Sequence, residues 1–269
     1  MKAVDSHAHV FRADSALTAD ARYRPAGDAT PETYLAHLDR HGFAYGVLIQ
    51  PSFLGYDNSQ MLAAIAAQPQ RLKGIAVIPT DTALPALQTL DRQGIAGIRL
   101  NLFGRATPDL GAPEWRGLLS RIDSLGWQVE LHCPPAVACE LLPRLRDYRG
   151  PVVLDHFGRV DPRKGVQDPD YQRLLDQLDP ERHWVKVSGF YRLGDNDQGR
   201  SHARDALALL LARGMRDRLV WGSDWPHTQF HQAMDYPASL AFMDTLAPDP
   251  VLRSRILADN ACRLFGFTS

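Results

Sequence analysis

Short apolar segments recur along the chain at intervals that suit strands separated by helices. Each is rich in Val, Ile and Leu and is bounded by turn residues, a pattern typical of strands buried on both faces. These segments cover residues 3–10, 45–50, 72–79, 95–102, 127–133, 152–158, 183–189 and 219–225. They predict a protein built on eight strands.

The intervening segments have the apolar spacing and the end signals of helices. Thr30 and Pro31 predict the start of a helix that Gly42 ends. Further helices are expected over residues 58–67, 84–93, 114–125, 137–148, 171–178, 202–213 and from about residue 236 onward. Strict alternation of strands and helices predicts parallel strands joined by right-handed crossovers.

Eight such units in 269 residues favour one (β/α)8 barrel domain over residues 1–269. An open, doubly wound sheet is the alternative. That fold usually has a glycine-rich phosphate loop after its first strand, whereas the first strand here ends in His7-Ala8-His9. The longest irregular stretches, residues 11–29, 103–113, 159–169 and 192–200, all follow strands. In a barrel they would surround the same C-terminal mouth.

Composition adds little to this fold but excludes several classes of protein. A formal charge of -1, from 30 basic and 31 acidic residues, gives no argument for binding to nucleic acid or to membranes. No apolar run is long enough to cross a bilayer, and a basic-then-apolar leader is absent. Three irregularly spaced cysteines do not suit a disulfide framework, so we expect a cytoplasmic protein. Assembly into a homo-oligomer stays open.

Candidate chemistry is concentrated at the C-terminal ends of the predicted strands. His7 and His9 share one face of the first strand, because side-chain direction repeats every second residue. Asp224 stands at the tip of the eighth strand, where a buried carboxylate needs a partner or a metal. Other polar side chains at strand ends are Gln50, Ser52, Arg99, Asn101, Arg105, His132, Asp155, His156, Arg159, Lys186, Ser188, Tyr191, Arg192 and His227.

Such a set of side chains can activate water in two ways. Imidazoles and a carboxylate can hold a Zn²⁺-like ion that keeps one position open for water. Without a metal, Asp224 can deprotonate water while histidines donate hydrogen bonds to a developing oxyanion. Both ways direct hydroxide at an electrophilic carbon. Nearby Arg99, Arg105 and Arg192 indicate an anionic substrate held by bidentate contacts.

These segments together resemble the amidohydrolase superfamily, whose fold is a (β/α)8 barrel with His-x-His on strand 1 and Asp on strand 8. The resemblance extends over the whole chain. More narrowly, the sequences GIRLNLFGR (97–105), LDHFGR (154–159), KVSGFYRL (186–193) and WGSDWPH (221–227) look like the branch of 2-pyrone-4,6-dicarboxylate and sugar-acid lactonases.

The resemblance implies roles for individual residues. Asp224 would be the general base, and His7, His9 and His156 would polarise the carbonyl of a lactone. The candidate substrate-binding residues are Ser52, Arg99, Arg105, Arg159, Tyr191 and Arg192. We therefore expect a hydrolase for a small anionic lactone.

Two positions depart from the superfamily pattern. Members with two metals carry a carbamylated lysine at the end of strand 4, whereas Arg99 stands there, which disfavours a bridged metal pair. His132 occupies a place on strand 5 where relatives with one metal often put a third histidine ligand. One divalent ion at His7, His9, His132 and Asp224 and a site without metal both stay open.

Three functions are compatible with these residues. Hydrolysis of a carboxylated lactone is the leading one, and a metal-dependent decarboxylase of the same superfamily is the alternative. A barrel that only binds a ligand is the third. Several arginines suit a carboxylate that is retained better than one that is lost, which favours hydrolysis.

Overall fold

The computed structural model describes residues 2–268, with the backbone alone for Asn196. Eight parallel strands neighbour one another in chain order, as the sequence predicts. They are β1 (Ala3–Ala8), β2 (Phe43–Ile49), β3 (Leu72–Ala76), β4 (Ile95–Asn101), β5 (Gln128–His132), β6 (Val152–Leu154), β7 (His183–Lys186) and β8 (Leu219–Val220). The (β/α)8 barrel is therefore confirmed.

The eighth strand is much shorter than the predicted segment 219–225, yet the residues that follow it still close the barrel. Asp224 N donates to His7 O and His9 N donates to Trp225 O, each at 2.8 Å. These bonds join the last strand segment to β1 directly. The chain after Val220 thus bends away from regular strand geometry while it stays paired with β1.

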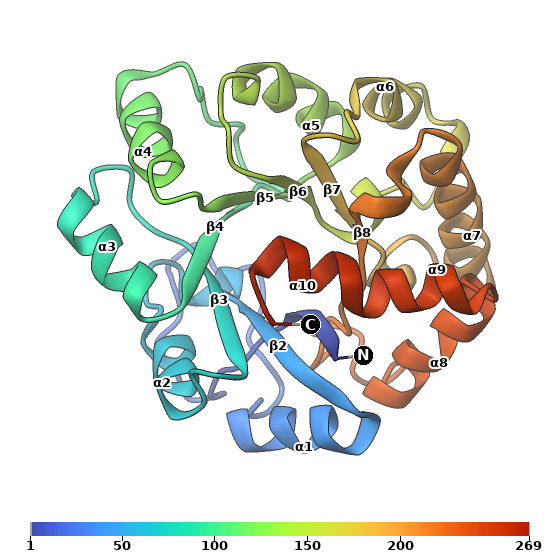
Figure 1. Ribbon diagram of the computed structural model, residues 1–269, viewed down its shortest axis with the longest axis horizontal. Coiled ribbons are helices and arrows are strands. Elements are labelled where there is room, and N and C mark those ends of the chain that lie inside the picture. The colour runs from blue at the N-terminus through green and yellow to red at the C-terminus, as the bar shows by residue number, and fades with distance from the viewer. Residues whose placement is uncertain (1, 269) are drawn as a thin grey trace.

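Helices surround the barrel (Figure 1). The outer ring contains α1 (Pro31–His41), α2 (Ser59–Ala67), α3 (Leu84–Arg92), α4 (Pro113–Asp123), α5 (Pro135–Leu141), α6 (Pro169–Gln177), α7 (Asn196–Ala212) and α8 (Tyr236–Leu246). Two further helices, α9 (Pro250–Ser254) and α10 (Asn260–Phe265), are joined by a π-helical segment, Arg255–Asp259. Among residues 2–268, no helix combines the length and apolar character needed to cross a bilayer.

Most predicted helices are confirmed, and the differences have local causes. Thr30 caps α1 by accepting from Thr33 N at 3.2 Å, as the end signals predict. Helix α5 stops at Leu141 rather than 148, because Pro143 cannot continue an α-helical hydrogen-bond ladder. Helix α7 begins at residue 196 rather than 202. A Cβ on Gly199 would lie 2.5 Å from Phe190 O, so this glycine permits close packing and does not mark a loop.

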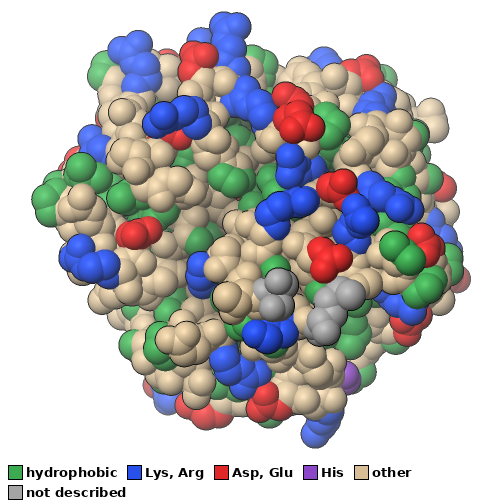
Figure 2. Space-filling view, viewed as in Figure 1, with side chains coloured by type: hydrophobic (Ala, Val, Ile, Leu, Met, Phe, Trp, Pro, Cys, Tyr) green, Lys and Arg blue, Asp and Glu red, His purple; other side chains and the backbone are tan. Residues whose placement is uncertain are grey.

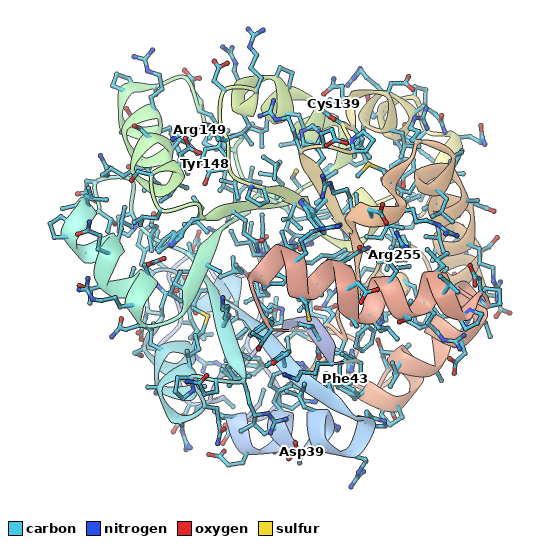
Figure 3. All side chains as sticks on the ribbon, viewed as in Figure 1. Asp39, Phe43, Cys139, Tyr148, Arg149 and Arg255 are labelled. Atoms are coloured by element: carbon cyan, nitrogen blue, oxygen red, sulfur yellow. The ribbon has the colours of Figure 1, made fainter. Side chains whose placement is uncertain are left out.

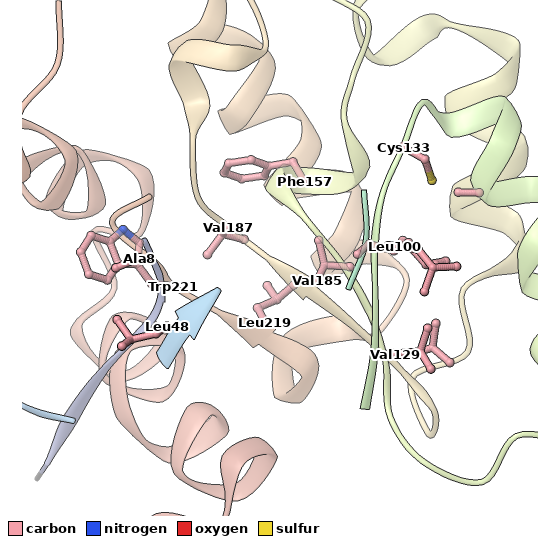
Figure 4. Packing of buried hydrophobic residues seen from close by; sticks show 14 of the residues in the cluster. Ala8, Leu48, Leu100, Val129, Cys133, Phe157, Val185, Val187, Leu219 and Trp221 are labelled. Atoms are coloured by element: carbon pink, nitrogen blue, oxygen red, sulfur yellow. The ribbon is translucent and has the colours of Figure 1, made fainter. Parts of the chain in front are cut away.

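Apolar side chains fill two layers of the barrel. Between strands and helices lie outward-facing residues that include Leu48, Val129 and Val185 (Figure 4). Inside the barrel, Val47 and Val220 belong to a second buried cluster that also contains Phe265 of α10. This second cluster occupies the N-terminal end of the barrel interior. The inward positions that follow it along the strands are therefore available for polar side chains.

The N-terminal end of the barrel is covered by α9 and α10, which cross in front of the strands (Figure 1). Asn260 donates to Leu219 O at 2.8 Å and fixes this cover to the start of β8. Basic and acidic side chains are interspersed over this face (Figure 2), and Arg255 lies here beside Asp217 (Figure 3). The cover leaves the opposite, C-terminal end as the mouth of the barrel.

Candidate active site at the C-terminal ends of the strands

Four charged side chains form a buried layer inside the barrel, here called the paired layer: Arg99, Glu130, Asp155 and Lys186. They come from β4, β5, the residue after β6, and β7, and none is more than 5% exposed. Lys186 Nζ lies 2.7 Å from Glu130 Oε1, and Arg99 contacts Asp155 Oδ2 through Nη2 at 2.8 Å and Nε at 2.9 Å. Two cations are thus matched by two carboxylates.

Burial and pairing have opposite effects on these carboxyl groups. Burial alone would raise the pKa of Asp155, but Arg99 and Lys186 hold it well below its usual range. Burial raises the pKa of Glu130 to about 7 in spite of Lys186. The 2.7 Å contact with an ammonium favours the ionised carboxylate at neutral pH, so we treat this pair as an ion pair.

His7 connects the paired layer to the site above it. Its Nδ1 lies 3.2 Å from Lys186 Nζ and 3.4 Å from Asp155 Oδ1, and its Nε2 lies 3.8 Å from Asp224 Oδ1. Burial and then Lys186 lower the pKa of His7 well below its usual value, so the ring is neutral. An ammonium only donates, so the Lys186 contact favours a proton on Nε2, whereas Asp155 Oδ1 only accepts and favours a proton on Nδ1.

His9 is oriented by one backbone acceptor. Its Nδ1 lies 2.7 Å from Ile49 O, and a carbonyl only accepts, so Nδ1 carries the proton. In the neutral ring the lone pair is on Nε2, which lies 3.6 Å from Asp224 Oδ1. With a proton on His7 Nε2, the two histidines of the His-x-His pair turn a donor and an acceptor toward Asp224 Oδ1.

Asp224 is fixed through one oxygen and free at the other. Its Oδ2 accepts from Tyr191 Oη and from Arg192 Nε, each at 2.6 Å. Among residues 2–268, Oδ1 is buried and has no hydrogen-bond partner. Burial alone would raise the pKa of Asp224, but Arg192 and His156 hold it well below its usual range. The carboxylate is therefore ionised at neutral pH, with one oxygen available to a ligand.

Two backbone features bring Asp224 to the histidines. Asp224 has a φ of 59°, in the left-handed region that non-glycine residues seldom adopt and that is concentrated at functional sites. Gly222 lies against β1 so closely that a Cβ there would be 2.4 Å from the Cβ of His7. Only glycine allows this approach, which explains the small residue before the acid.

His156 also reaches this point with an unusual backbone, at a φ of 50°. Its Nδ1 lies 2.9 Å from Ser188 Oγ, and its ring centroid is 4.9 Å from that of His7. Burial lowers its pKa to about 3, although Asp224 and Asp155 act in the other direction. His156 is therefore a neutral polar group beside Asp224 at ordinary pH.

A cavity of about 170 Å³ opens over these groups. Four arginines line it, Arg22, Arg99, Arg159 and Arg192, whereas Asp224 is its single acidic lining residue in the described chain. His9, His132, His156 and Ser52 also line it. The cavity suits a small anionic molecule.

The structure brings most of the predicted site residues together, with three differences in position. His7 is fully buried beneath the cavity lining, and Tyr191 lies behind Asp224 rather than on the lining. Arg105 lies outside the lining and pairs with Asp20 at 2.7 Å, so its role as a substrate ligand stays a prediction. In its place Arg22 lines the cavity.

Sequence reasoning missed Arg22 and Glu130. Arg22 belongs to the irregular stretch 11–29, where no periodicity indicates which side chain faces inward. Glu130 lies in the middle of β5 rather than at its tip. Its signal was an acidic residue in the middle of a predicted strand, with Lys186 inside another strand as a partner of opposite charge.

Three atoms form a donor set that suits one divalent ion. His7, His9 and Asp224 each offer one ligand atom, and these atoms lie within 4.8 Å of one another. Asp224 Oδ1 and His7 Nε2 are buried without hydrogen-bond partners in the described chain. The predicted fourth ligand, His132, is not part of this group, so it stays a prediction. Nitrogen and oxygen donors of this kind are typical of zinc.

Comparisons with known proteins agree with this geometry. The sequence profile of the amidohydrolase family matches residues 4–267. The chain is 33% identical to 4-sulfomuconolactone hydrolase of Hydrogenophaga intermedia, over 97% of this chain and 88% of that protein. It is 30% identical to 2-pyrone-4,6-dicarboxylate hydrolase of Comamonas testosteroni, over 98% of this chain and 90% of that protein.

Solved structures give the same pattern. A probable 2-pyrone-4,6-dicarboxylic acid hydrolase from Acinetobacter baumannii, crystallised with citric acid bound, is 47% identical with a TM-score of 0.98 and covers 99% of this chain and 100% of that one. The 2,6-dihydroxybenzoate decarboxylase from Rhizobium is 17% identical with a TM-score of 0.71, over 98% of both chains. The second likeness concerns the fold alone.

Proposed function

Since the chain belongs to the amidohydrolase family, we propose that it is a hydrolase that opens a lactone carrying anionic groups. One observation carries the proposal: an ionised carboxylate with one free oxygen, Asp224 Oδ1, lies beside two histidines under an arginine-lined cavity. The relatives that are 30–33% identical are named as hydrolases of anionic lactones, which supports the same reaction here. The substrate is a small molecule.

In the proposed reaction Asp224 acts as the general base. Arg192 and Tyr191 occupy Oδ2, so Oδ1 is the oxygen that can accept a proton from water. The resulting hydroxide adds to the lactone carbonyl carbon, and the bond from that carbon to the ring oxygen then breaks. The proton taken by Asp224 returns to the leaving oxygen, or leaves to solvent if an enolate forms. The product carries one new carboxylate.

Neutral histidines stabilise the oxyanion in this proposal. A proton on His7 Nε2, which the Lys186 contact favours, gives a donor close to Asp224 for the developing charge. His156 is neutral and lies beside His7, so its ring is a second candidate donor. Each can strengthen its hydrogen bond as the carbonyl oxygen becomes negative.

A divalent ion held by His7, His9 and Asp224, with the His7 proton on Nδ1 toward Asp155, would lower the pKa of its bound water and polarise the carbonyl. The decarboxylase alternative has weaker support, because 2,6-dihydroxybenzoate decarboxylase is 17% identical to this chain and its likeness concerns the fold alone. An arginine-rich cavity also favours a reaction in which the acid groups of the substrate are retained.

The test replaces Asp224 and follows the opening of 2-pyrone-4,6-dicarboxylate and 4-sulfomuconolactone. Asp224→Asn keeps the shape but removes the base, so we expect turnover to fall about a thousandfold. Asp244→Asn is a matched control, because Asp244 is an exposed partner of Arg253 outside the cavity. Circular dichroism should give the same fold for both variants. Near-normal turnover in Asp224→Asn would reject Asp224 as the base, and a wild-type protein inert toward lactones would reject the reaction.

A further inference from the structure

A series of buried polar side chains lies behind the carboxylate of Asp224. Tyr191 Oη lies 2.6 Å from Asp224 Oδ2 and 3.0 Å from His227 Nδ1. Neither Tyr191 nor His227 lines the cavity, and His227 is only 2% exposed. These three side chains, here called the anchor series, therefore begin at the proposed base and lead away from the substrate.

The direction of each hydrogen bond in the anchor series follows from the available protons. Tyr191 has one hydroxyl proton, and burial together with Asp224 raises the pKa of Tyr191 well above its usual value, so the proton stays on the oxygen. An ionised carboxylate only accepts, so Tyr191 donates to Asp224 Oδ2. The hydroxyl oxygen is then an acceptor toward His227, and His227 Nδ1 must carry a proton.

His227 is a neutral ring with one nitrogen engaged and the other not. Burial lowers its pKa to about 4, although Asp224 acts in the other direction. With the proton on Nδ1, the lone pair is on Nε2, which is buried and has no hydrogen-bond partner among residues 2–268. An unsatisfied buried polar atom is costly, so packing alone would favour an apolar residue here. Within the described chain, the contact of Nδ1 with Tyr191 is the side-chain hydrogen bond that accounts for an imidazole at this position.

The backbone turns sharply to bring His227 to this place. His227 N donates to Asp224 O at 2.8 Å, which closes a turn directly after the proposed base. Asp224 and His227 both have a φ of 59°, in the left-handed region that non-glycine residues seldom adopt. Strain of this kind persists where the surrounding structure requires it and is concentrated at functional sites. The turn thus returns the imidazole to the rear of the carboxylate that precedes it.

The same turn also holds the second partner of Asp224 Oδ2. Arg192 Nε lies 2.6 Å from this oxygen, while Arg192 Nη2 donates to Thr228 O at 3.4 Å. Two consecutive residues of the turn, His227 and Thr228, therefore orient the two donors that fix Oδ2. The carboxylate is held against rotation, so Oδ1 stays directed at the histidines and the cavity.

We propose that His227 is a positioning residue: its Nδ1 proton fixes the hydroxyl of Tyr191 on Asp224 Oδ2 and so keeps Oδ1 aimed at the attacking water. The inference rests on the proposed function, because it takes Asp224 as the base. It adds a residue that acts on the reaction without touching the substrate. Preorganisation of the base lowers the cost of reaching the reactive geometry. Loss of this contact should therefore reduce kcat and leave KM nearly unchanged, since the cavity lining stays intact.

The first test replaces His227 in the full chain and follows the opening of the two lactones named above. His227→Leu removes the donor, so we expect kcat to fall about tenfold while KM stays within about twofold. His227→Asn should restore most of this loss, because its amide nitrogen can take the place of Nδ1 and asparagine tolerates a positive φ. The matched control is His231→Leu, since His231 is exposed on the same segment outside the cavity lining. It should leave kcat and KM unchanged.

A double-mutant cycle separates positioning from a purely structural role. Tyr191→Phe removes the hydroxyl that lies between His227 and Asp224. If His227 acts through this hydroxyl, adding His227→Leu to Tyr191→Phe should cause no further loss of kcat. Losses of kcat that multiply in the double variant would overturn the inference. Equal kcat values for His227→Asn and His227→Leu would also overturn it.

A measurement without substrate keeps this inference separate from the proposed function. The NMR chemical shifts of the ring nitrogens of His227 in the wild-type protein should show a protonated Nδ1 and a bare Nε2. The opposite tautomer would overturn the inference, and the proposed function would stand if lactones are opened. If the ring shows the expected tautomer but no lactone is opened, the hydrogen bond from His227 to Tyr191 stands and the proposed hydrolysis fails.

Discussion

The paired layer and two arginines of the cavity lining, Arg22 and Arg159, lie near the same cavity but differ in how their charge is balanced. In the paired layer, Arg99 and Lys186 each have a carboxylate within 2.8 Å. Arg22 and Arg159, by contrast, face a carbonyl, an amide and an aromatic ring. Balanced charges hold the barrel interior in one arrangement, whereas unbalanced ones are available to a ligand. An arginine near a site therefore indicates binding only once its partner is known.

The strongest test of this comparison removes the lysine of the paired layer. Lys186→Met would leave Glu130 and Asp155 buried without their shared ammonium, and breaking a buried pair typically costs about 3–5 kcal/mol. We expect the midpoint of urea unfolding to fall accordingly. The double variant Lys186→Met with Glu130→Leu should recover part of the loss, since an apolar replacement of a whole buried pair is often tolerated. Unchanged stability in Lys186→Met would mean that the layer is not a structural unit.

Arg99→Ala should give a smaller loss of stability. Asp155 would lose two hydrogen bonds but would keep Lys186 at 3.6 Å, so we expect about 2 kcal/mol in urea unfolding. The sequence alone gives Arg99 a role in substrate binding, which predicts weaker binding with normal stability. Unfolding curves measured beside calorimetry of pyridine-2,4-dicarboxylate separate the two roles. Arg22→Gln, by contrast, should leave the unfolding midpoint unchanged.

The smallest expected effect is on the pH dependence of stability, through His156, whose ring lies 4.9 Å from that of His7. Its pKa is lowered to about 3 in the folded chain, while an unfolded histidine titrates near 6.5. The unfolded state then binds more protons below pH 6.5, so this contribution to stability is complete above that pH and is lost on acidification. In the wild type, His156 should lower the free energy of unfolding by about 1 kcal/mol for each pH unit below 6.5. The variant His156→Asn should lack this part of the pH dependence. Parallel curves for the variant and the wild type would contradict a neutral, buried His156.

The barrel could be predicted because its signals are local. Alternating apolar segments and helix ends such as Thr30 and Gly42 depend on nearby residues, and the positions of His7 and Asp224 at the mouth follow from the barrel rule. The family and the lactone-hydrolase relatives confirm the resemblance. The individual roles of the site residues stay predictions.

What could not be predicted depends on contacts between distant segments. Nothing local distinguishes Arg22, which lines the cavity, from Arg105, which pairs with Asp20 outside it. Glu130 acquires its meaning only from Lys186 on another strand. In the sequence, Gly199 suggests that no helix passes through it. In the structure it lies inside α7, where its missing side chain leaves room for the carbonyl of Phe190. In each case the deciding neighbour is far away in sequence.

The closure of the barrel ties the two ends of this sequence together where the chemistry is expected. Ser223 N donates at 2.8 Å to the carboxylate of Asp5, 218 residues earlier, next to the bond between Asp224 and His7. During translation, His7 and His9 leave the ribosome long before Asp224 does. A nascent polypeptide stalled before Asp224 would hold both histidines but not the carboxylate assigned here as the base. Turnover would thus begin only after nearly all of this sequence has been synthesised and its last strand has docked.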